Sequence, residues 1–394
     1  MRDHWMNCIT HRDKEVDTFL ADYFDDTSRH VLLVAGAGFD PRSRMVAEKL
    51  ALTLGSRLTA IFIREERPGA DAMLRERADG NQALLFAAVP NSEVIEVNIF
   101  ADDGAPVGGA RIAAELAGRP LPSNVTDVLL DLSALSIGVG FPAAKLLLER
   151  CEQTEHTAFH LIVASNPVLD DCIRSESSDR PSPVRGFAPL ADTNGDQSDL
   201  EVAQVWIPQL ARGLTKTLHR IGRQLQVRDF YKVCPVLPFP ARDPRRADDL
   251  IGEYEEQITQ EWHVDPRDFI YASEWNPLDT YRRLSRLKLR FDRTMRGTFA
   301  LQMILSPIGS KVMAAGALMA AIEHDMVVQY VETESYSLDN TSQEVGGKTI
   351  DHDGNASLVH VILSGPLYGA FPSTVSSLPG TQEEDANLSS VATK

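Results

Sequence analysis

The sequence predicts an α/β fold built from two tandem Rossmann-like lobes with mainly parallel sheets. Two observations carry this prediction. Apolar runs alternate with helical stretches of about 10 to 15 residues, which is the rhythm of βαβ units. Many of these runs are apolar without interruption, as in strands that are covered on both faces. The chain has 394 residues, of which 43% are hydrophobic and 24% are charged, and this length suits two domains with a core each.

The first half of the chain repeats a strand, a turn and a helix. Residues 30–35, "HVLLVA", predict a strand, and a turn at 36–40 leads into an amphipathic helix. Residues 126–153, "TDVLLDLSALSIGVGFPAAKLLLERCEQ", repeat this pattern. Further strands are expected at 57–65 and 92–100 and within 157–173, with a helix at 106–118. We assign residues 1–173 to an N-terminal Rossmann-like domain.

A polar segment separates the two halves. Residues 174–201 are rich in Ser, Asp, Pro and Gly, which predicts a linker or a long surface loop. The α/β rhythm then resumes and predicts a C-terminal Rossmann-like domain over 202–377. Its expected helices are 205–225, 245–262, 277–295 and 311–324, and its expected strands are 229–240, 268–274, 298–306, 326–335 and 357–365. The tail 378–394 is expected to be disordered.

The composition of the chain indicates which kinds of partner it can bind and in which cell compartment we expect it. A formal net charge of −17 argues against a protein that coats duplex nucleic acid, because counterion release needs clustered Lys and Arg. A local basic pocket for a small anion stays open. The chain has no apolar run of roughly 18 to 20 residues and no apolar core of a signal peptide near its start. Four widely spaced cysteines, Cys8, Cys151, Cys172 and Cys234, are typical of reduced thiols. We therefore expect a cytoplasmic protein without membrane contact.

The first strand-to-helix turn, "AGAGFDPRS", places Gly36 and Gly38 where a Rossmann loop approaches a pyrophosphate. The GxGxxG pattern is incomplete, because Pro41 stands at the third position. Glu65 and Glu66 follow the second strand, where a ribose-binding acid is expected, but somewhat far along the chain. Flexibility for a tight turn is therefore the preferred role of the two glycines.

The tripeptide Asp-Pro-Arg occurs three times, at 40–42, 243–245 and 265–267. Asp and Pro are good residues for starting a helix, which explains the first two positions of the tripeptide. Capping does not need the arginine. Asp40, Arg42 and Arg245 are therefore kept as candidate ligand-binding residues.

Three further strand ends carry candidate binding residues. Asp131 ends a predicted parallel strand, where it can hold a ligand or cap the next helix. Arg242 and Arg245 belong to the basic cluster in "VLPFPARDPRRADD", which can bind phosphate or pair with the neighbouring aspartates. Glu274 follows the strand in "YASEWNPLDTYRR".

The turn in "MILSPIGSKVMAAGALMAAIE", residues 303–323, has the best chemistry for an anion. Ser306, Gly309, Ser310 and Lys311 lie where a helix begins, so free backbone N–H groups, two hydroxyls and one ammonium are expected together. The order Gly-Ser-Lys is not a Walker A loop, which requires GxxxxGK[ST]. We expect Lys311 to share a cleft with Arg245.

This stretch resembles the second motif of CARF domains, the Rossmann-like sensors of CRISPR systems. The similarity covers "LSPIGSKVMAAGALMAAIEHDMVVQYV", and it departs from the motif in having Ser306-Pro307-Ile308 before the glycine. In CARF domains the equivalent turn contacts a cyclic oligonucleotide, so the resemblance implies that Gly309, Ser310 and Lys311 bind a nucleotide-type ligand. The related SAVED domains of prokaryotic defence systems, which contain two fused CARF-like lobes, also fit a tandem chain of this length.

Three functions remain open. The first is a cytoplasmic sensor or adaptor for a nucleotide-type or other phosphorylated ligand, in prokaryotic antiviral defence, with a protein partner or as a homo-oligomer. The second is a hydrolase of a nucleotide or sugar phosphate, with Asp40, Asp131 or Glu274 as acid or base. The third is a structural subunit of a larger complex that uses segments 174–201 and 312–323 for protein contacts. The lack of a recognisable catalytic motif favours a binding protein over an enzyme.

No metal site is predicted. Asp351-His352-Asp353 and His11-Arg12-Asp13 contain metal-ligating residue types, but the first lies in a Gly- and Asn-rich turn and the second lies outside any clear element.

Overall fold

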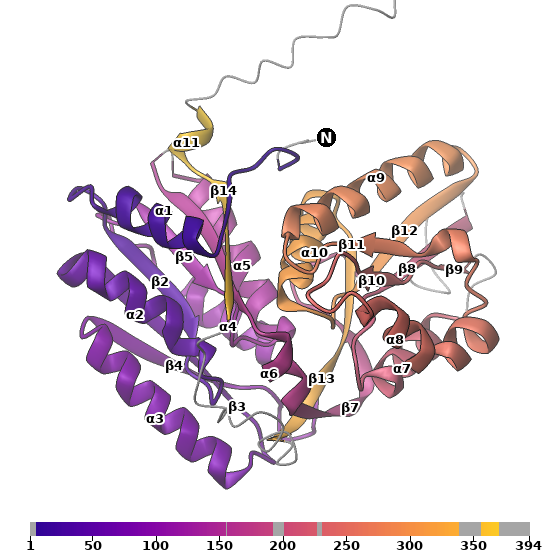
Figure 1. Ribbon diagram of the computed structural model, residues 1–394, viewed down its shortest axis with the longest axis horizontal. Helices are drawn as coiled ribbons and strands as arrows, with labels where there is room; N and C mark the ends of the chain where they lie inside the picture. Colours follow the sequence, from indigo (N-terminus) through magenta and orange to yellow (C-terminus); the bar gives the residue numbers. More distant parts are fainter. Residues whose placement is uncertain (1–4, 155, 192–200, 227–230, 339–355, 370–394) are drawn as a thin grey trace, which may run out of the picture.

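The computed structural model describes residues 5–154, 156–191, 201–226, 231–338 and 356–369 and has two α/β lobes side by side (Figure 1). Asp351-His352-Asp353 and the tail 378–394 lie outside these residues. The mixed α/β class with mainly parallel strands is confirmed. Within the described residues, no helix combines the length and the apolarity needed to cross a bilayer.

Lobe 1 comprises the described residues up to Cys172 together with 356–369, and it contains a seven-stranded sheet. The strand order is β1 (Thr10–Arg12), β14 (Ser357–Ser364), β6 (Ala158–Ser165), β5 (Asp127–Asp131), β2 (Val31–Gly36), β3 (Leu58–Glu66) and β4 (Ser92–Asn98). Only β14 runs antiparallel to its neighbours. The helices are α1 (Lys14–Phe24), α2 (Arg42–Leu54), α3 (Ala72–Ala88), α4 (Gly108–Ala117) and α5 (Ile137–Glu152). The first three pack on one face of the sheet, and α4 and α5 pack on the other.

Lobe 2 lies between residues 173 and 338, and its described residues form a five-stranded sheet and a two-stranded one. The order in the larger sheet is β7 (Ile173–Pro183), β13 (Val327–Leu338), β12 (Phe299–Ser306), β8 (Glu201–Pro208) and β9 (Tyr231–Val233), and β10 (Val236–Pro238) pairs with β11 (Ile270–Ala272). A bridge between Gln209 and Val236 joins the two sheets. The helices of this lobe are α7 (Thr215–Leu225), α8 (Arg246–Glu253), α9 (Pro277–Met295) and α10 (Lys311–Glu323). Two short helices, α6 (Pro167–Cys172) and α11 (Pro366–Gly369), adjoin the ends of β7 and β14.

The parallel strands are arranged alike in the two lobes. In lobe 1 the order is β4-β3-β2-β5-β6 followed by antiparallel β14. In lobe 2 it is β11, then β10 and β9, which both adjoin β8, then β12 and β13, followed by antiparallel β7. The antiparallel strand comes last along the chain in lobe 1 and first in lobe 2. The strand order therefore reverses at β2 and β5 in one lobe and at β8 and β12 in the other. Ligands of open α/β sheets bind at such reversal points. The helices that follow the reversal, α5 and α10, occupy equivalent places.

Three segments differ from the sequence expectations. Residues 174–183 of the expected linker belong to β7 (Ile173–Pro183), a partly exposed edge strand whose backbone pairs with β13. Its polar sequence is that of a strand with little core contact. Residues 357–364 belong to lobe 1 as β14, because they pair with β6 and β1. Residues 201–208 are the central strand β8 and not part of a helix, because "VAQVWIP" is buried throughout.

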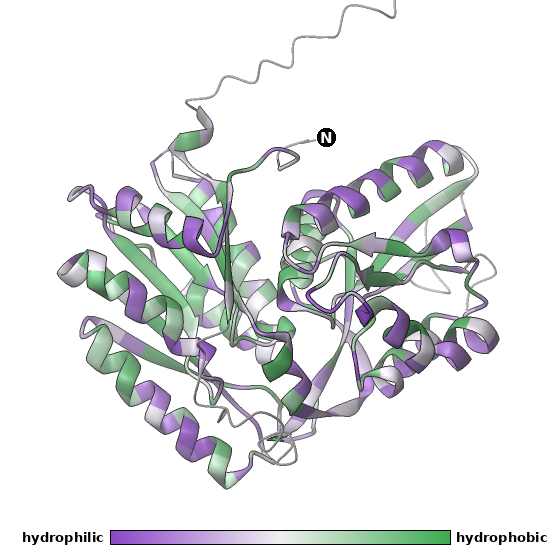
Figure 2. Ribbon diagram, in the orientation of Figure 1, coloured by the Kyte–Doolittle hydropathy of each residue, from purple (hydrophilic) through white to green (hydrophobic). Residues whose placement is uncertain are grey.

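The Ala-rich helix α10 is buried inside the molecule. All its side chains from Val312 to Ala321 are buried, and it packs against α9 and β6. One hydrophobic cluster includes α5 of lobe 1 together with α9 and α10 of lobe 2, so the two lobes share a continuous core. The small residues of α10 therefore serve internal packing. The hypothesis that segment 312–323 contacts another protein does not fit, because this helix is covered by the chain itself. Figure 2 shows the hydrophobic strands inside and the polar outer faces of the helices.

Candidate functional site

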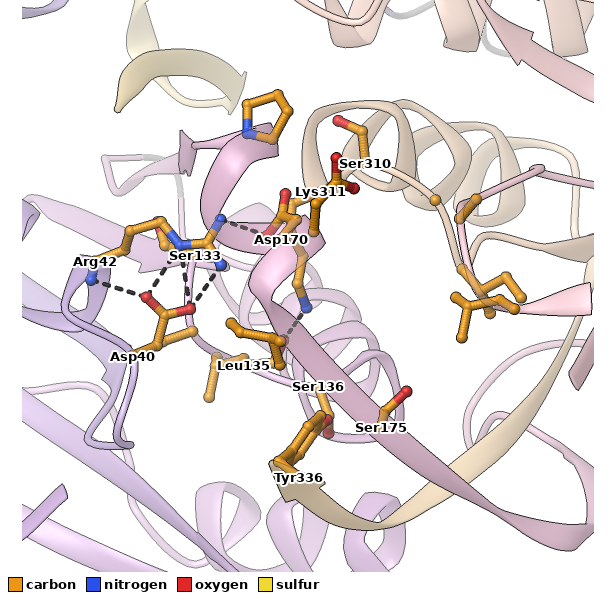
Figure 3. A pocket seen from close by; sticks show the side chains of 18 of the residues that line it. Asp40, Arg42, Ser133, Leu135, Ser136, Asp170, Ser175, Ser310, Lys311 and Tyr336 are labelled. Carbon is orange, nitrogen blue, oxygen red and sulfur yellow. Dashed lines mark hydrogen bonds and ion pairs between the residues drawn. The ribbon is translucent and has the colours of Figure 1, made fainter. Parts of the chain in front are cut away.

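A cavity of about 280 Å³ lies between the lobes, at the carboxyl ends of β2, β3 and β5 on one side and of β8, β10 and β12 on the other. Seen from close by, both lobes contribute side chains to it (Figure 3). The sequence-derived candidates that line it are Gly38, Asp40, Arg42, Glu274, Gly309, Ser310 and Lys311. The candidates outside its lining are Gly36, Asp131, Arg242, Arg245 and Ser306.

Lys311 begins α10 and reaches from lobe 2 to lobe 1. Its ammonium donates a hydrogen bond to the carbonyl oxygen of Leu135, in the turn between β5 and α5 (Figure 3). Among the described residues, no carboxylate lies within ion-pair distance of its Nζ. Burial lowers the pKa of Lys311 from its ordinary value, while the carboxylate of Glu65 opposes this effect. Lys311 is thus a partly buried cation without a carboxylate partner in the described chain.

The N-terminus of α5 faces the same cavity. Ser136 precedes this helix, and its backbone N–H donates to Oε1 of Glu65 at 2.7 Å. The Ser136 side chain lines the cavity and is 7% exposed, yet its hydroxyl has no hydrogen-bond partner among the described residues. The hydroxyl of Ser310, at the start of α10, is also buried without a partner in the part of the chain that the structure describes. Two helix N-termini with unpaired hydroxyls therefore line one cavity.

The N-terminus of α2 is already occupied by a carboxylate of the chain itself. Asp40 Oδ1 accepts the backbone N–H of Arg42 at 2.9 Å, and the Arg42 guanidinium binds the same carboxylate at 2.6 to 3.1 Å. Arg42 also pairs with Asp170 Oδ1 at 2.8 Å. Burial alone disfavours the charged guanidinium, but Asp170 and Asp40 outweigh it and raise the pKa of Arg42. Asp40 and Arg42 therefore neutralise each other where a Rossmann loop would hold pyrophosphate.

Gly36 and Asp131 support the cavity from outside its lining. A Cβ on Gly36 would lie 3.2 Å from the backbone of Ala134, so glycine permits the close approach of the two turns. Asp131 accepts bonds from the N–H of Ser133 at 2.9 Å and from its hydroxyl. Its other oxygen is buried and has no partner within the described residues, and burial raises the pKa of Asp131 to about 7. Asp131, the last residue of β5, thus holds the turn residue Ser133, which lines the cavity.

Arg246, not Arg245, lines the cavity on the lobe 2 side. Its guanidinium binds Asp171 through two hydrogen bonds of 2.9 and 3.0 Å. Arg245 precedes α8 on the exposed side, and its backbone N–H donates to Asp243 Oδ1 at 2.9 Å. The expectation that Lys311 and Arg245 share a cleft is therefore wrong, because the chain turns into α8 between Arg245 and Arg246. Arg242 donates its backbone N–H to Glu274 Oε2 at 3.0 Å.

Ser306 has a structural role. It is fully buried, and its hydroxyl accepts the indole N–H of Trp206 at 2.9 Å. This bond joins the adjacent strands β12 and β8.

A buried ionic group missed by the sequence analysis closes one end of the cavity. Arg67 of lobe 1 binds Glu65 Oε2 at 2.8 Å and Glu332 Oε1 of lobe 2 at 3.3 Å, and its guanidinium lies 5.0 Å from the Tyr336 ring. Burial raises the pKa of Glu332 to about 7, although Arg67 opposes this shift. Glu65 was recognisable as an acid after the second strand, but its partner on β13 is distant in the chain.

The carboxylates considered for a hydrolase do not form a free pair. Asp40 and Glu274 line the same cavity, but Asp40 is bound by Arg42 and Glu274 by the backbone of Arg242. Asp131 lies outside the lining. Within the described residues, no cluster of three or more His, Cys, Asp or Glu side chains is arranged to hold a metal ion.

His11 belongs to a hydrogen-bonded chain away from the cavity. Asp127 Oδ1 lies 3.0 Å from Nε2 of His160, His160 Nδ1 lies 3.0 Å from Nε2 of His360, and His360 Nδ1 lies 3.0 Å from Nδ1 of His11. Because an ionised Asp127 only accepts, three neutral histidines satisfy the chain when every N–H points towards it. Burial, followed by the nearby His160 and His11, lowers the pKa of His360 well below its ordinary value.

Comparisons with known proteins do not assign this chain to a family. No protein-family model matches the chain, and no curated protein sequence matches it. One similar solved structure is the cytoplasmic domain of a prokaryotic cation chloride cotransporter, with 11% identity, 80% of this chain and 96% of that chain covered, and a TM-score of 0.23. Another is a putative dehydrogenase from Burkholderia cenocepacia with bound NADP, with 10% identity, 70% and 91% covered, and a TM-score of 0.20. At these scores neither structure informs the function of this chain.

Proposed function

We propose that this protein is a sensor or adaptor that binds a nucleotide-type or other phosphorylated ligand between its lobes. The observation that carries the proposal is Lys311, a cation without a carboxylate partner among the described residues, in a cavity lined by the N-termini of α5 and α10. The unpaired hydroxyls of Ser136 and Ser310 lie beside these N-termini. Backbone N–H groups, hydroxyls and an ammonium are the donors that bind phosphate in proteins.

The charges around the cavity favour the binding of an anion next to Lys311. Arg42, Arg67 and Arg246 each bind carboxylates of the chain. Their positive charges are therefore largely neutralised. Lys311 keeps its charge available, because a carbonyl oxygen is its hydrogen-bond partner. A phosphate at Lys311 would replace a neutral acceptor by a charged one, which strengthens the hydrogen bond.

The remaining walls suit the less polar part of a small organic ligand. Apolar side chains of both lobes line the cavity: Ile63, Leu135, Leu210, Pro238, Ile308 and Met313. Phe39 and Tyr336 add two rings, whose centroids lie 5.5 Å apart. A volume of about 280 Å³ is close to the lower end of the usual range for ligand sites, roughly 300 to 1,000 Å³. These dimensions favour a ligand no larger than about a mononucleotide in this conformation.

The position of Lys311 between the lobes offers a way for ligand binding to change the conformation of the protein. Its ammonium on α10 holds the Leu135 carbonyl of lobe 1, so a ligand that takes over this ammonium alters a contact between the lobes. The resemblance of the Gly309-Ser310-Lys311 turn to CARF domains adds a cytoplasmic role in prokaryotic antiviral defence to the proposal. A protein partner or a second copy would then receive the signal.

Isothermal titration calorimetry with AMP and with inorganic phosphate tests this function. We compare the wild-type protein with Lys311→Met and with the control Lys216→Met, which makes the same change at an exposed lysine in the first turn of α7. Loss of a charge-assisted hydrogen bond should weaken AMP binding by about 1.5 to 3 kcal/mol, or roughly 10- to 150-fold. The control should bind like wild type. If wild-type protein binds neither probe at millimolar concentration, the proposal is wrong.

A further inference from the structure

The outward face of α9 carries a row of arginines. Arg283, Arg286, Arg290 and Arg293 recur at spacings of three and four residues and are all exposed, and Arg296 follows just after the helix ends. This spacing puts them on one side of the helix over about 15 Å. The opposite side packs inwards through Leu284, Leu287 and Met295. In Figure 2 the outer face of α9 is strongly hydrophilic.

Most of this row has no carboxylate partner in the described chain. Only Arg283 forms an ion pair, with Asp279 at 3.2 Å. Arg286, Arg290, Arg293 and Arg296 have none among the described residues. Elsewhere, the partly buried arginines Arg119 and Arg220 pair with carboxylates. The exposed Arg75 of α3 and Arg223 of α7 have no carboxylate partner among the described residues, but each stands alone on its helix in this respect. What distinguishes α9, in a chain with a net charge of −17, is that one face gathers four exposed arginines and that three of them have no carboxylate partner in the described chain. Arg290 has a ring contact instead, with its guanidinium 5.9 Å from the ring centroid of Phe291.

Helix stability does not explain the row. Cations near a helix C-terminus interact favourably with its dipole, which accounts for Arg293. Arg286 and Arg290 lie in the middle of α9, beyond the reach of that effect. Like charges three or four residues apart destabilise a helix. The row therefore indicates a binding role for this face.

We propose that this face of α9, the row Arg283, Arg286, Arg290 and Arg293, is a docking surface for an acidic segment of a partner protein. Guanidinium groups bind carboxylates through paired hydrogen bonds, so a segment with several Asp or Glu side chains complements the row. The inference is independent of the ligand proposed for the cavity between the lobes.

Nucleic acid fits the surface less well. Single-stranded nucleic acid needs exposed aromatic rings for base stacking. The most exposed aromatic side chains of the described residues, Phe86, Phe239 and Tyr271, lie outside α9. Isolated carboxylates on a protein segment need no such platform.

Fluorescence anisotropy with a labelled 15-residue poly-L-glutamate peptide tests the proposal. The variant Arg286→Glu/Arg290→Glu reverses the centre of the row. The control Arg75→Glu/Arg223→Glu makes the same charge change at two exposed arginines on different helices, α3 and α7. At low salt we expect wild type and control to bind the peptide alike and the α9 variant to bind at least tenfold more weakly. Because all four positions are exposed, we expect both variants to unfold at the same urea midpoint as wild type. Equal midpoints will show that both variants are folded.

Three results would overturn the proposal. The first is no binding of the peptide to wild-type protein, or equal binding to the α9 variant. The second is tighter binding of a labelled 15-nucleotide oligothymidylate than of the peptide, lost in the α9 variant, which would identify a nucleic-acid surface. The third is a wild-type dimer in light scattering that becomes monomeric in the α9 variant, which would identify a second copy as the occupant.

Discussion

Replacing Gly316 with Ala tests how tightly α10 packs against α9. In a helix this change normally stabilises by about 0.5 to 1 kcal/mol, because glycine loses more backbone entropy on folding. Here a Cβ at position 316 would lie 2.2 Å from the carbonyl oxygen of Pro277 and 2.7 Å from Cβ of Thr280. The obstacle is the backbone of the first turn of α9, which cannot rotate away as a side chain can. The helices would have to separate by roughly 1 Å to restore van der Waals distances.

Overpacking of this kind costs about 1 to 3 kcal/mol. After the gain in helix propensity, we expect Gly316→Ala to lower the free energy of unfolding by about 1 to 2 kcal/mol. With an m-value of about 3 kcal/mol/M, the urea midpoint measured by circular dichroism should fall by roughly 0.5 M. Gly80→Ala in α3 is the control, because nothing lies within 4 Å of its added Cβ, and it should stabilise slightly. A Gly316→Ala variant as stable as wild type would refute this packing argument.

Two further predictions concern buried titratable groups. The pKa of His360 is lower in the folded protein than its value of about 6.5 in the unfolded chain. As the pH falls, protons therefore bind the unfolded state first. The free energy of unfolding should then decrease below about pH 6.5, by up to about 1.4 kcal/mol per pH unit. In urea unfolding between pH 7.5 and 5, His360→Phe should show a shallower fall than wild type; an equal slope would contradict the assignment. The pKa of Asp131 is raised to about 7, so the stability that its protonated form contributes at low pH is lost between about pH 4 and 7. Asp131→Asn should therefore be more stable than wild type at pH 8, on the order of 3 kcal/mol, and nearly equal to it at pH 4. A gain of the same size at both pH values would count against the buried carboxyl group.

Local patterns predicted much of the fold and part of the candidate site. The turn with Gly309, Ser310 and Lys311 could be placed because a strand, a small-residue turn and a helix follow one another within about 20 residues. Strands β7 and β14 could not be placed, because their pairing partners β13 and β6 are far away in the chain. Such partners are set by tertiary packing, which a local pattern does not contain.

The side chains of the cavity were harder to choose than its turns. Arg245 and Arg246 are adjacent in a basic cluster, and only the entry into α8 decides that Arg246 faces the cavity. Ser136 was missed because the turn before α5 contains no basic residue. Ser136 could nevertheless have been chosen, because a serine that precedes a helix at the carboxyl end of a parallel strand lies where ligands bind in α/β sheets. The acidic partner of Arg67 on the other lobe had no signal in the local sequence.

The continuous path of lobe 2 from Ile173 to Leu338 bears on how such a chain can arise. These two residues are cross-strand partners of β7 and β13, so the lobe starts and ends at one place. A whole domain with adjacent ends can be inserted into a loop of another domain without disturbing it. Here lobe 2 interrupts lobe 1 between β6 and β14, which remain paired with each other. The architecture is therefore that of a domain insertion, in which one lobe can be gained in a single genetic step and its shared core with α10 refined afterwards.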